Sequence, residues 1–148
     1  MEEFNTLEKV EELFKKNNYN GTENNYFIAF NDLTKNSGFV RGSEYPYFAV
    51  LINETENGFG LIYLTYKALS FKLDFSKLQI MENKFEIINK EDIQSIKVKN
   101  YALLNSKKKK IEIKTTKKRI HYLYACVDQP EIPYHNEAFA KFLEKYSK

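Results

Sequence analysis

Short apolar runs bounded by turn-forming residues recur from residue 47 onward and predict β-strands. The Asn57-Gly58 dipeptide separates the first two runs and is a strong signal for a tight hairpin. Seven short strands in succession are typical of an antiparallel β-sandwich or barrel. The predicted strands cover residues 48–52, 59–66, 70–75, 79–88, 93–101, 109–115 and 119–126, the fourth with a turn-like break at 82–84. Before these seven, residues 26–31 are also apolar enough for a strand.

Helical spacing of apolar residues is confined to the two ends of the chain. Residues 5–8 (Asn-Thr-Leu-Glu) have the pattern of a helix cap, and the apolar spacing after them predicts a helix over about 6–17. Asn136 is expected to cap a final helix, on which Ala138, Phe139 and Phe142 share one side. This last helix should close one end of the sheet.

Length and composition are those of one globular domain that is rich in sheet. The chain has 148 residues, 43% of them hydrophobic and 16% aromatic, without a tryptophan. The first residues are acidic and no apolar h-region follows them, and no apolar run approaches the length that spans a bilayer. Cys126 is the one cysteine, so no internal disulfide is possible. We therefore expect a cytoplasmic protein.

Charge is the most uneven property of the sequence. Residues 97–119 hold ten of the 23 lysines and arginines but only one of the 20 acids, Glu112, so the rest of the chain is net acidic. If strands 93–101 and 109–115 pair, alternation places Lys97, Lys99, Lys110 and Lys114 on one outward face. The candidate binding residues for an anionic surface are Lys97, Lys99, Lys107, Lys108, Lys109, Lys110, Lys114, Lys117, Lys118 and Arg119.

Four interpretations of this basic segment remain open at the level of sequence. Lysines are the usual protection of a sheet edge against aggregation, so the segment is explained without a ligand. It also suits an anionic membrane surface, to which it would attach the protein peripherally. An acidic protein partner is the third interpretation. Nucleic acid is disfavoured, because only Tyr101, Tyr122 and Tyr124 are near enough to stack on bases. A single arginine among lysines favours diffuse attraction over bidentate recognition of phosphate.

Catalytic and metal-binding patterns are weak. His121 and Cys126 are an odd number of residues apart on one predicted strand, so their side chains should face opposite ways, with the cysteine in the core and the histidine at the edge. His135 falls in a proline-bounded loop and is expected to be a turn residue. The spacing of these residues does not fit a zinc site, and the sequence has no glycine-rich phosphate loop. We expect no cofactor, no metal and no enzymatic activity.

Two segments resemble GRAM and bacterial pleckstrin-homology-like domains. Residues 60–71, Gly-Leu-Ile-Tyr-Leu-Thr-Tyr-Lys-Ala-Leu-Ser-Phe, are similar to the Gly-x-Leu-Tyr-Leu-Thr-x-x-x-Leu-x-Phe hairpin of these domains. Residues 85–98 are similar to the segment in which an x-x-Asp-Ile-x-x-Ile turn leads into a long strand. The joint order of the two segments supports the resemblance, which covers roughly residues 47–147.

The resemblance implies a fold and a class of function. The fold would be α+β: a seven-stranded antiparallel β-sandwich or partly open barrel with a C-terminal capping helix, formed by residues 47–148. Residues 1–46 would be an N-terminal helix and extension of the same domain. In lipid-binding members the loop between the first two strands supplies basic side chains, but here residues 53–57 carry two acids and no base. That difference argues against capture of an inositol phosphate by this loop.

The sequence thus predicts a non-enzymatic binding module. Protein interaction or self-association is the first expectation, because catalytic residues are lacking and the strands are rich in aromatic residues. Peripheral attachment to an anionic membrane surface through residues 97–119 is the alternative. A small enzyme whose site is assembled from distant residues is the third possibility, and it would require a polar pocket around His121 or His135.

Overall fold

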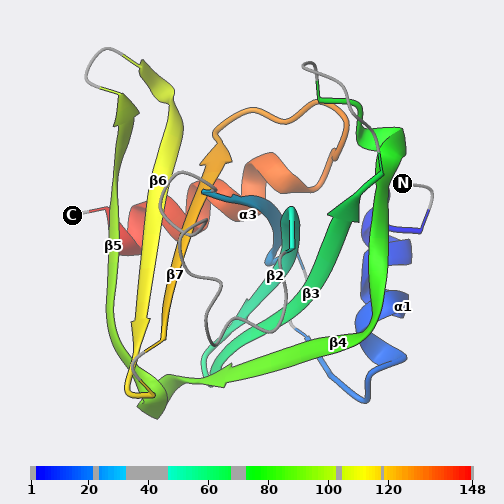
Figure 1. The fold of residues 1–148 in the computed structure, drawn as a ribbon, viewed down its shortest axis with the longest axis horizontal. Helices are drawn as coiled ribbons and strands as arrows, with labels where there is room; N and C mark the ends of the chain where they lie inside the picture. Colours follow the sequence, from blue (N-terminus) through cyan, green and yellow to red (C-terminus); the bar gives the residue numbers. More distant parts are fainter. Residues whose placement is uncertain are drawn as a thin grey trace.

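A computed structural model describes residues 3–21, 24–32, 47–67, 73–102, 105–117 and 119–147 (Figure 1). Two α-helices flank seven strands in this part of the chain. The helices are α1 (Leu7–Lys15) and α3 (His135–Tyr146). The strands are β1 (Tyr26–Asn31), β2 (Ala49–Thr55), β3 (Gly58–Tyr66), β4 (Leu78–Asn89), β5 (Ile93–Ala102), β6 (Asn105–Thr115) and β7 (Ile120–Cys126).

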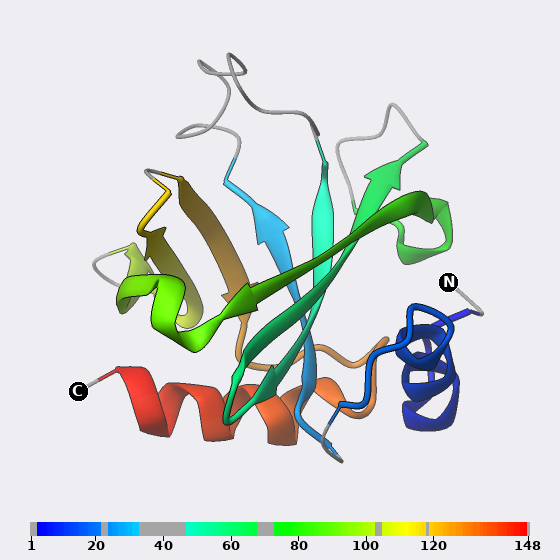
Figure 2. The ribbon, with the colours of Figure 1, turned by 90° about the horizontal axis from the view of Figure 1, so that it is seen from below.

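The strands form one antiparallel sheet in the order β4-β3-β2-β1-β7-β6-β5. β4 and β5 follow each other in the chain, joined by a short 3-10 turn at Lys90–Asp92, yet they lie at the two ends of this order. The sheet therefore curls round without closing through a β4–β5 ladder, and β5–β6–β7 face β2–β3–β4 across the interior (Figure 1). Figure 2 shows α3 lying across one end of the curled sheet.

The predicted class is confirmed, but the identity of two strands is corrected. An α+β chain with seven antiparallel strands and a helix at each end was expected and is found. The strand predicted at 70–75 is not found in its described part, residues 73–75, which holds irregular backbone and the start of a 3-10 turn at Phe75, an apolar residue buried without being in a strand. Residues 70–72 lie outside the described residues. The seventh strand is instead β1, which lies between β2 and β7.

The strand predicted at 26–31 is confirmed as β1, but the sequence did not place it in the seven-stranded sheet, because both of its faces are covered. All six of its residues are buried, so the run Tyr-Phe-Ile-Ala-Phe-Asn shows no alternation of apolar and polar positions. A division of the chain at residue 46 would separate this central strand from its two neighbours. The expected break at 82–84 is found as an irregularity within one strand: the β3–β4 register shifts between the pairs Ile62–Phe85 and Leu64–Ile80, and Asn83 has a left-handed φ of 60°, but β4 continues through it.

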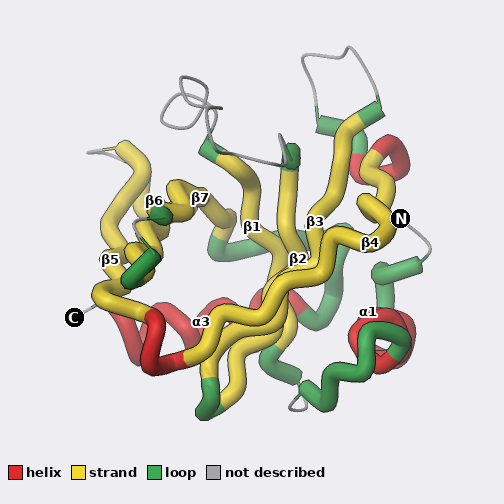
Figure 3. The backbone as a smooth tube through the Cα atoms, turned by 60° about the horizontal axis from the view of Figure 1, so that its bottom comes forward, coloured by secondary structure: helices red, strands yellow, loops and turns green. Residues whose placement is uncertain are grey.

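Two apolar clusters lie on the two sides of the sheet. The inner cluster fills the space between the curled sheet and α3, with Phe27, Phe59, Leu123, Phe139 and Phe142 among its members. The outer cluster lies between α1 and the outer face of β1–β4, and β7 contributes only the partly buried Tyr124 to it. Figure 3 shows α1 beside β4, far from β5. No described helix therefore covers the outer face of β5, β6 and most of β7.

The ends of the helices are set by local contacts. The Thr6 hydroxyl accepts a hydrogen bond from the Lys9 amide at 3.2 Å, so a side-chain cap is present as predicted, but one residue later than the pattern with Glu8 at the third helical position implied. The expected cap at Asn136 is wrong, because α3 already begins at His135. The Asn136 side chain instead accepts a hydrogen bond from the Gln129 amide and donates one to Asp128, so it holds the preceding loop.

Glu54 ties the end of α3 to the β2–β3 hairpin. Its Oε2 accepts hydrogen bonds from Lys145 Nζ at 2.9 Å and from Tyr146 Oη at 2.7 Å. The acids of residues 53–57 thus include one that fixes the capping helix. We expect Glu54→Gln to lower the free energy of unfolding by about 1 kcal/mol, because the charged acceptor is lost. Urea denaturation measures this, with Lys141→Gln as a control that removes only the exposed Glu137 pair and should change nothing; equal losses would contradict the role of Glu54.

Candidate functional site

The outer face of β5–β7, which no described helix covers, gathers lysines and tyrosines from three strands. In the ladder Lys99 lies opposite Lys110, and Lys97 lies opposite Glu112, as the alternation in the sequence predicts. Their neighbours in β6 point inward and are buried, as Ile111 shows. We call this surface the lysine face; it comprises Lys97, Lys99, Tyr101, Lys108, Lys110, Glu112, Lys114, Tyr122 and Tyr124.

The tyrosines are attached to the core and lie close to lysine ammonium groups. Lys108 Nζ lies 4.9 Å from the centre of the Tyr101 ring and 4.8 Å from that of Tyr124. The Tyr124 ring stacks on buried Phe30 with 5.4 Å between centroids. Burial also raises the pKa of the Tyr124 hydroxyl, so it stays neutral. The tyrosine rings therefore form the base of the lysine face, and the lysine side chains extend over them with their ammonium groups.

The positive charge of the lysine face is not neutralised within the described part of the chain. The ion pairs found there join Arg119 to Glu86, Lys141 to Glu137 and Lys145 to Glu54, and none involves a lysine of this face. Glu112 is the one acid on the face and forms no ion pair there, although it lies opposite Lys97 in the ladder. Five lysines thus leave a strong positive field on this side.

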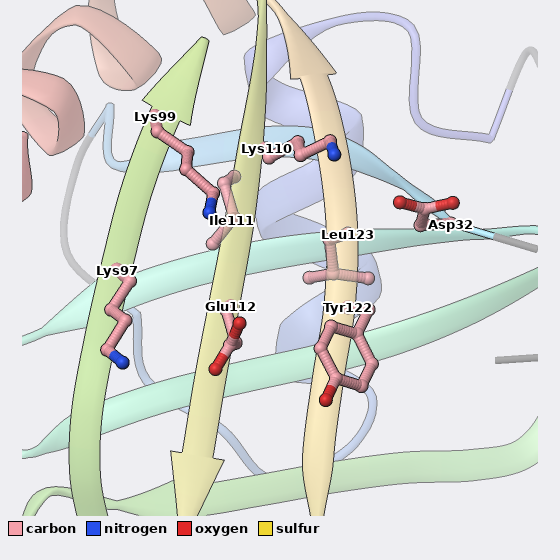
Figure 4. A pocket seen from close by; sticks show the side chains of 8 residues that line it. All are labelled: Asp32, Lys97, Lys99, Lys110, Ile111, Glu112, Tyr122 and Leu123. Carbon is pink, nitrogen blue, oxygen red and sulfur yellow. The ribbon is translucent and has the colours of Figure 1, made fainter. Parts of the chain in front are cut away.

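A hollow of about 70 Å³ opens within the lysine face (Figure 4). Lys97 and Lys99 come from β5, Lys110 from β6, and Tyr122 from β7. The other lining residues are Asp32, Ile111, Glu112 and Leu123. This volume is far below the several hundred Å³ of a site for a drug-sized ligand, so the hollow suits a single small group.

The other predicted binding residues lie elsewhere. Lys107 and Lys109 are on the opposite side of β6 from Lys108 and Lys110, and Lys109 Nζ donates to Asn100 Oδ1 at 2.7 Å. Lys117 is exposed in the β6–β7 turn, at the other end of β6 from the β5–β6 connection. Lys118 lies outside the described residues. The basic segment of the sequence is thus divided in space.

Arg119 belongs to a polar cluster between the two ends of the sheet rather than to the lysine face. Its Nη1 donates to Glu86 Oε2 at 2.8 Å, and the Tyr63 hydroxyl donates to Glu86 Oε1. Burial is the main reason that the pKa values of Tyr63 and Tyr47 are raised, and the charge of Glu86 raises both further. Because Glu86 is on β4 and Arg119 precedes β7, the pair links halves of the sheet that no β4–β5 ladder joins.

Arg119→Gln should therefore lower the stability of the fold without weakening the binding of the protein to anionic vesicles. We expect a loss of about 1 kcal/mol in the free energy of unfolding, a small value because both side chains are partly exposed. Urea denaturation gives this loss, and co-sedimentation with anionic vesicles should be unchanged beyond the effect of one charge. A large loss of vesicle binding in this variant would show that Arg119 does contact the membrane, as the sequence predicted.

The candidate catalytic residues are placed for structure. His121 and Cys126 do lie on opposite sides of β7, but His121 is the buried one and the cysteine is half-buried on the outer side, the reverse of the expectation. The pairing with β6 explains these positions, because His121 lies opposite Ile113, an inward-facing residue, and therefore faces inward as well. Burial raises the pKa of the Cys126 thiol, which keeps it protonated.

His135 is a buried structural residue of α3. Its Nδ1 accepts a hydrogen bond from the Ile28 amide at 3.1 Å, and its Nε2 then donates to the Cys126 carbonyl at 2.7 Å. Burial lowers the pKa of His135 to about 4, so the ring is neutral at pH 7. No cluster of metal-ligating side chains is present among the described residues. Neither described helix has the length and apolarity needed to cross a membrane.

Comparisons with protein-family models, curated proteins and solved structures gave no match to this chain. The site therefore rests on its own geometry. Sequence reasoning found the lysines, because they alternate with apolar residues, and it found Tyr101, Tyr122 and Tyr124 near them, but it did not show that lysines and tyrosines share one face. The spacing of two between Tyr122 and Tyr124 already puts both on one side of a strand. Only the β6–β7 register shows that this is also the side of Lys108 and Lys110.

Proposed function

We propose that this protein is a non-catalytic binding module with a pleckstrin-homology-like fold, and that it attaches peripherally to anionic membranes through the lysine face. The carrying observation is the presence of five lysines on one sheet face that no described helix covers, without a carboxylate partner in the described residues.

The fold proposal is supported by the order of elements. Seven antiparallel strands followed by a C-terminal helix are what the resemblance implies. The comparison with the basic loop of lipid-binding members has to be changed, however, because the first strand is β1, Tyr26–Asn31, and not the strand that begins near residue 48. The loop between the first two strands is then the segment 32–48, which includes Lys35 and Arg41 in sequence, whereas residues 53–57 join the second and third strands. Most of segment 32–48 lies outside the described residues.

The chemistry of the lysine face matches a membrane interface on two counts. Each lysine near an anionic bilayer contributes roughly 1 kcal/mol, and the attraction acts over about one Debye length. Tyrosine rings prefer the headgroup level, where the ring is apolar and the hydroxyl is wet. Tyr101, Tyr122 and Tyr124 supply such rings between the lysines. The combination supports binding to a surface more than recognition of one sequence or shape.

Protein interaction or self-association, the first expectation from sequence, has less support. Stable interfaces between proteins have an apolar centre. Among the described residues the large hydrophobic side chains with high exposure are Leu73 and Ile87, which are on neither the lysine face nor one common element. Nucleic acid would need rings free to stack on bases. Here Tyr124 is already stacked on Phe30, and Lys108 lies over both Tyr124 and Tyr101.

A non-catalytic role is supported by the state of the residues that would do chemistry. Both histidines are buried, and His135 uses both ring nitrogens in hydrogen bonds to backbone. Neither histidine nor Cys126 lines the hollow of the lysine face or the two cavities beside the β2–β3 turn and beside residues 80–85.

Co-sedimentation with liposomes tests the proposal. We expect binding to vesicles that contain phosphatidylglycerol, none to pure phosphatidylcholine, and a loss of at least tenfold when salt rises from 50 to 500 mM, because screening shortens the reach of exposed charges. Equal binding to neutral and anionic vesicles, or no binding to either at low salt, would overturn it.

A further inference from the structure

The hollow in the lysine face brings like charges together. Lys99 and Lys110 are direct partners in the β5–β6 ladder, and directly opposed like charges destabilise a pair of strands. Lys97 lies two residues from Lys99 on the same side of β5, and all three lysines line the hollow. In Figure 4 the Lys97 and Lys99 side chains reach from β5 toward β6, and Lys110 extends across β7 toward Asp32. No described carboxylate forms an ion pair with any of them. Without a ligand, the arrangement costs stability.

The size and the chemistry of the hollow fit one compact anion. A volume of about 70 Å³ admits a phosphoryl group but not a sugar or a base attached to it. Lysine acts on phosphate as a point charge with rotatable donors, so three ammonium groups from two strands can contact different oxygens of one group. Tyr122 on the opposite wall adds a phenolic side chain. A phosphate monoester, with a charge between −1.5 and −2 at neutral pH, offers more charge in this volume than a diester.

We propose that this hollow is a subsite for a phosphate monoester, held by Lys97, Lys99 and Lys110. The inference rests on the proposed function, because it uses the same face. It adds that this face binds a phosphate monoester more tightly than other anions of the membrane surface. The group could belong to a lipid headgroup such as phosphatidic acid or to a free phosphate. Both offer the same three terminal oxygens to the lysines.

The acids of the hollow set a limit on its affinity. Asp32 is only 4% exposed. Its backbone amide donates a hydrogen bond to the Tyr122 carbonyl at 2.9 Å, and the residue makes a further interaction as well. Glu112 is partly exposed beside Lys97 and opposes an incoming anion. Glu112→Gln should therefore raise the affinity for the monoester several-fold, whereas a lysine cluster without a subsite would gain equally for every anionic surface.

The test compares two vesicle types of equal measured surface potential at pH 7.5: phosphatidylcholine with phosphatidic acid, a monoester, and phosphatidylcholine with phosphatidylglycerol, a diester. Wild type should bind the monoester vesicles at least fivefold more tightly. The variant Lys97→Gln/Lys99→Gln/Lys110→Gln should lose this ratio. The matched variant Lys108→Gln/Lys114→Gln/Lys117→Gln removes the same charge outside the hollow and should weaken both affinities while keeping the ratio.

A ratio near one in wild type, or a ratio lost equally in both triple variants, would overturn the subsite and leave the general attraction standing. Failure of the proposed function is a different result, namely no binding to either vesicle. Inorganic phosphate, added against chloride at equal ionic strength, then separates the sources. Displacement from monoester vesicles at millimolar concentration assigns the subsite to the phosphoryl group itself, and a ratio that survives phosphate assigns it to the headgroup in its bilayer.

Discussion

Replacement of the five lysines of the lysine face by glutamine should lower the partition onto anionic vesicles by about three orders of magnitude. Each lysine contributes roughly 1 kcal/mol near an anionic surface, and every 1.4 kcal/mol is a factor of ten. The variant combines the changes at Lys97, Lys99, Lys108, Lys110 and Lys114. Co-sedimentation at low salt, with a lipid titration, measures the change.

The control for this variant removes five exposed lysines from other surfaces. Lys9, Lys15 and Lys16 belong to α1 or its end, Lys77 precedes β4, and Lys90 precedes β5. Their replacement by glutamine gives the same net charge and should lower the partition by no more than about tenfold, through long-range attraction alone. Because Lys99 faces Lys110, the first variant should also unfold at an equal or higher urea concentration than wild type. Equal losses of binding in the two variants would show that total charge, and not this face, governs attachment.

Acidification from pH 7 to pH 5 should lower the free energy of unfolding by about 4 kcal/mol. Burial, aided by the nearby charge of Arg119, lowers the pKa of His121 to about 3, and burial lowers that of His135 to about 4. Both histidines titrate near 6.5 in the unfolded chain. Between these values the unfolded state binds more protons than the folded state, so stability falls as the pH falls. At pH 5 each histidine accounts for about 2 kcal/mol of the loss.

Urea denaturation at pH 7, 6 and 5 measures this dependence, and the range avoids most of the titration of ordinary carboxylates. His121→Leu should halve the dependence of the free energy of unfolding on pH, because one of the two titrating rings is removed. The variant should fold, since His121 Nε2 has no hydrogen-bond partner in the described structure and the leucine would lie among apolar residues. His135→Leu would also leave the Ile28 amide without its acceptor and is a poorer test. A midpoint that stays constant from pH 7 to 5 in wild type would show that the two rings reach water in the folded state.

The sheet and its basic face could be predicted where one side of a strand is wet. In β5 and β6 the residues Ile96, Val98, Ile111 and Ile113 face the inner cluster and the lysines between them face outward, so a period of two is visible in the sequence. β1 is buried on both sides and shows no such alternation, so its apolar run predicted a strand but not its place in the sheet. The rule failed for Phe75, which is buried in a short turn.

Contacts between distant segments account for what the sequence did not show. Nothing near His121 in the chain reveals that its side of β7 faces the inner cluster, because this depends on pairing with β6. Glu54 has an ordinary place next to a turn, and its role comes from α3, 91 residues further along. The hollow likewise needs residues from β5, β6 and β7 together with Asp32, which follows β1. Such a site has no signature in any single stretch.

The central claim is that the lysine face is the surface that meets the membrane. The chain has no tryptophan, so one introduced tryptophan reports on its own surroundings. Tyr101→Trp places this reporter on the face, and Asn20→Trp places it on the exposed segment after α1, away from β5. With anionic vesicles that contain brominated lipid, we predict a blue shift and quenching for the Tyr101→Trp protein and neither change for the Asn20→Trp protein. Quenching at position 20 but not at position 101 would contradict the account.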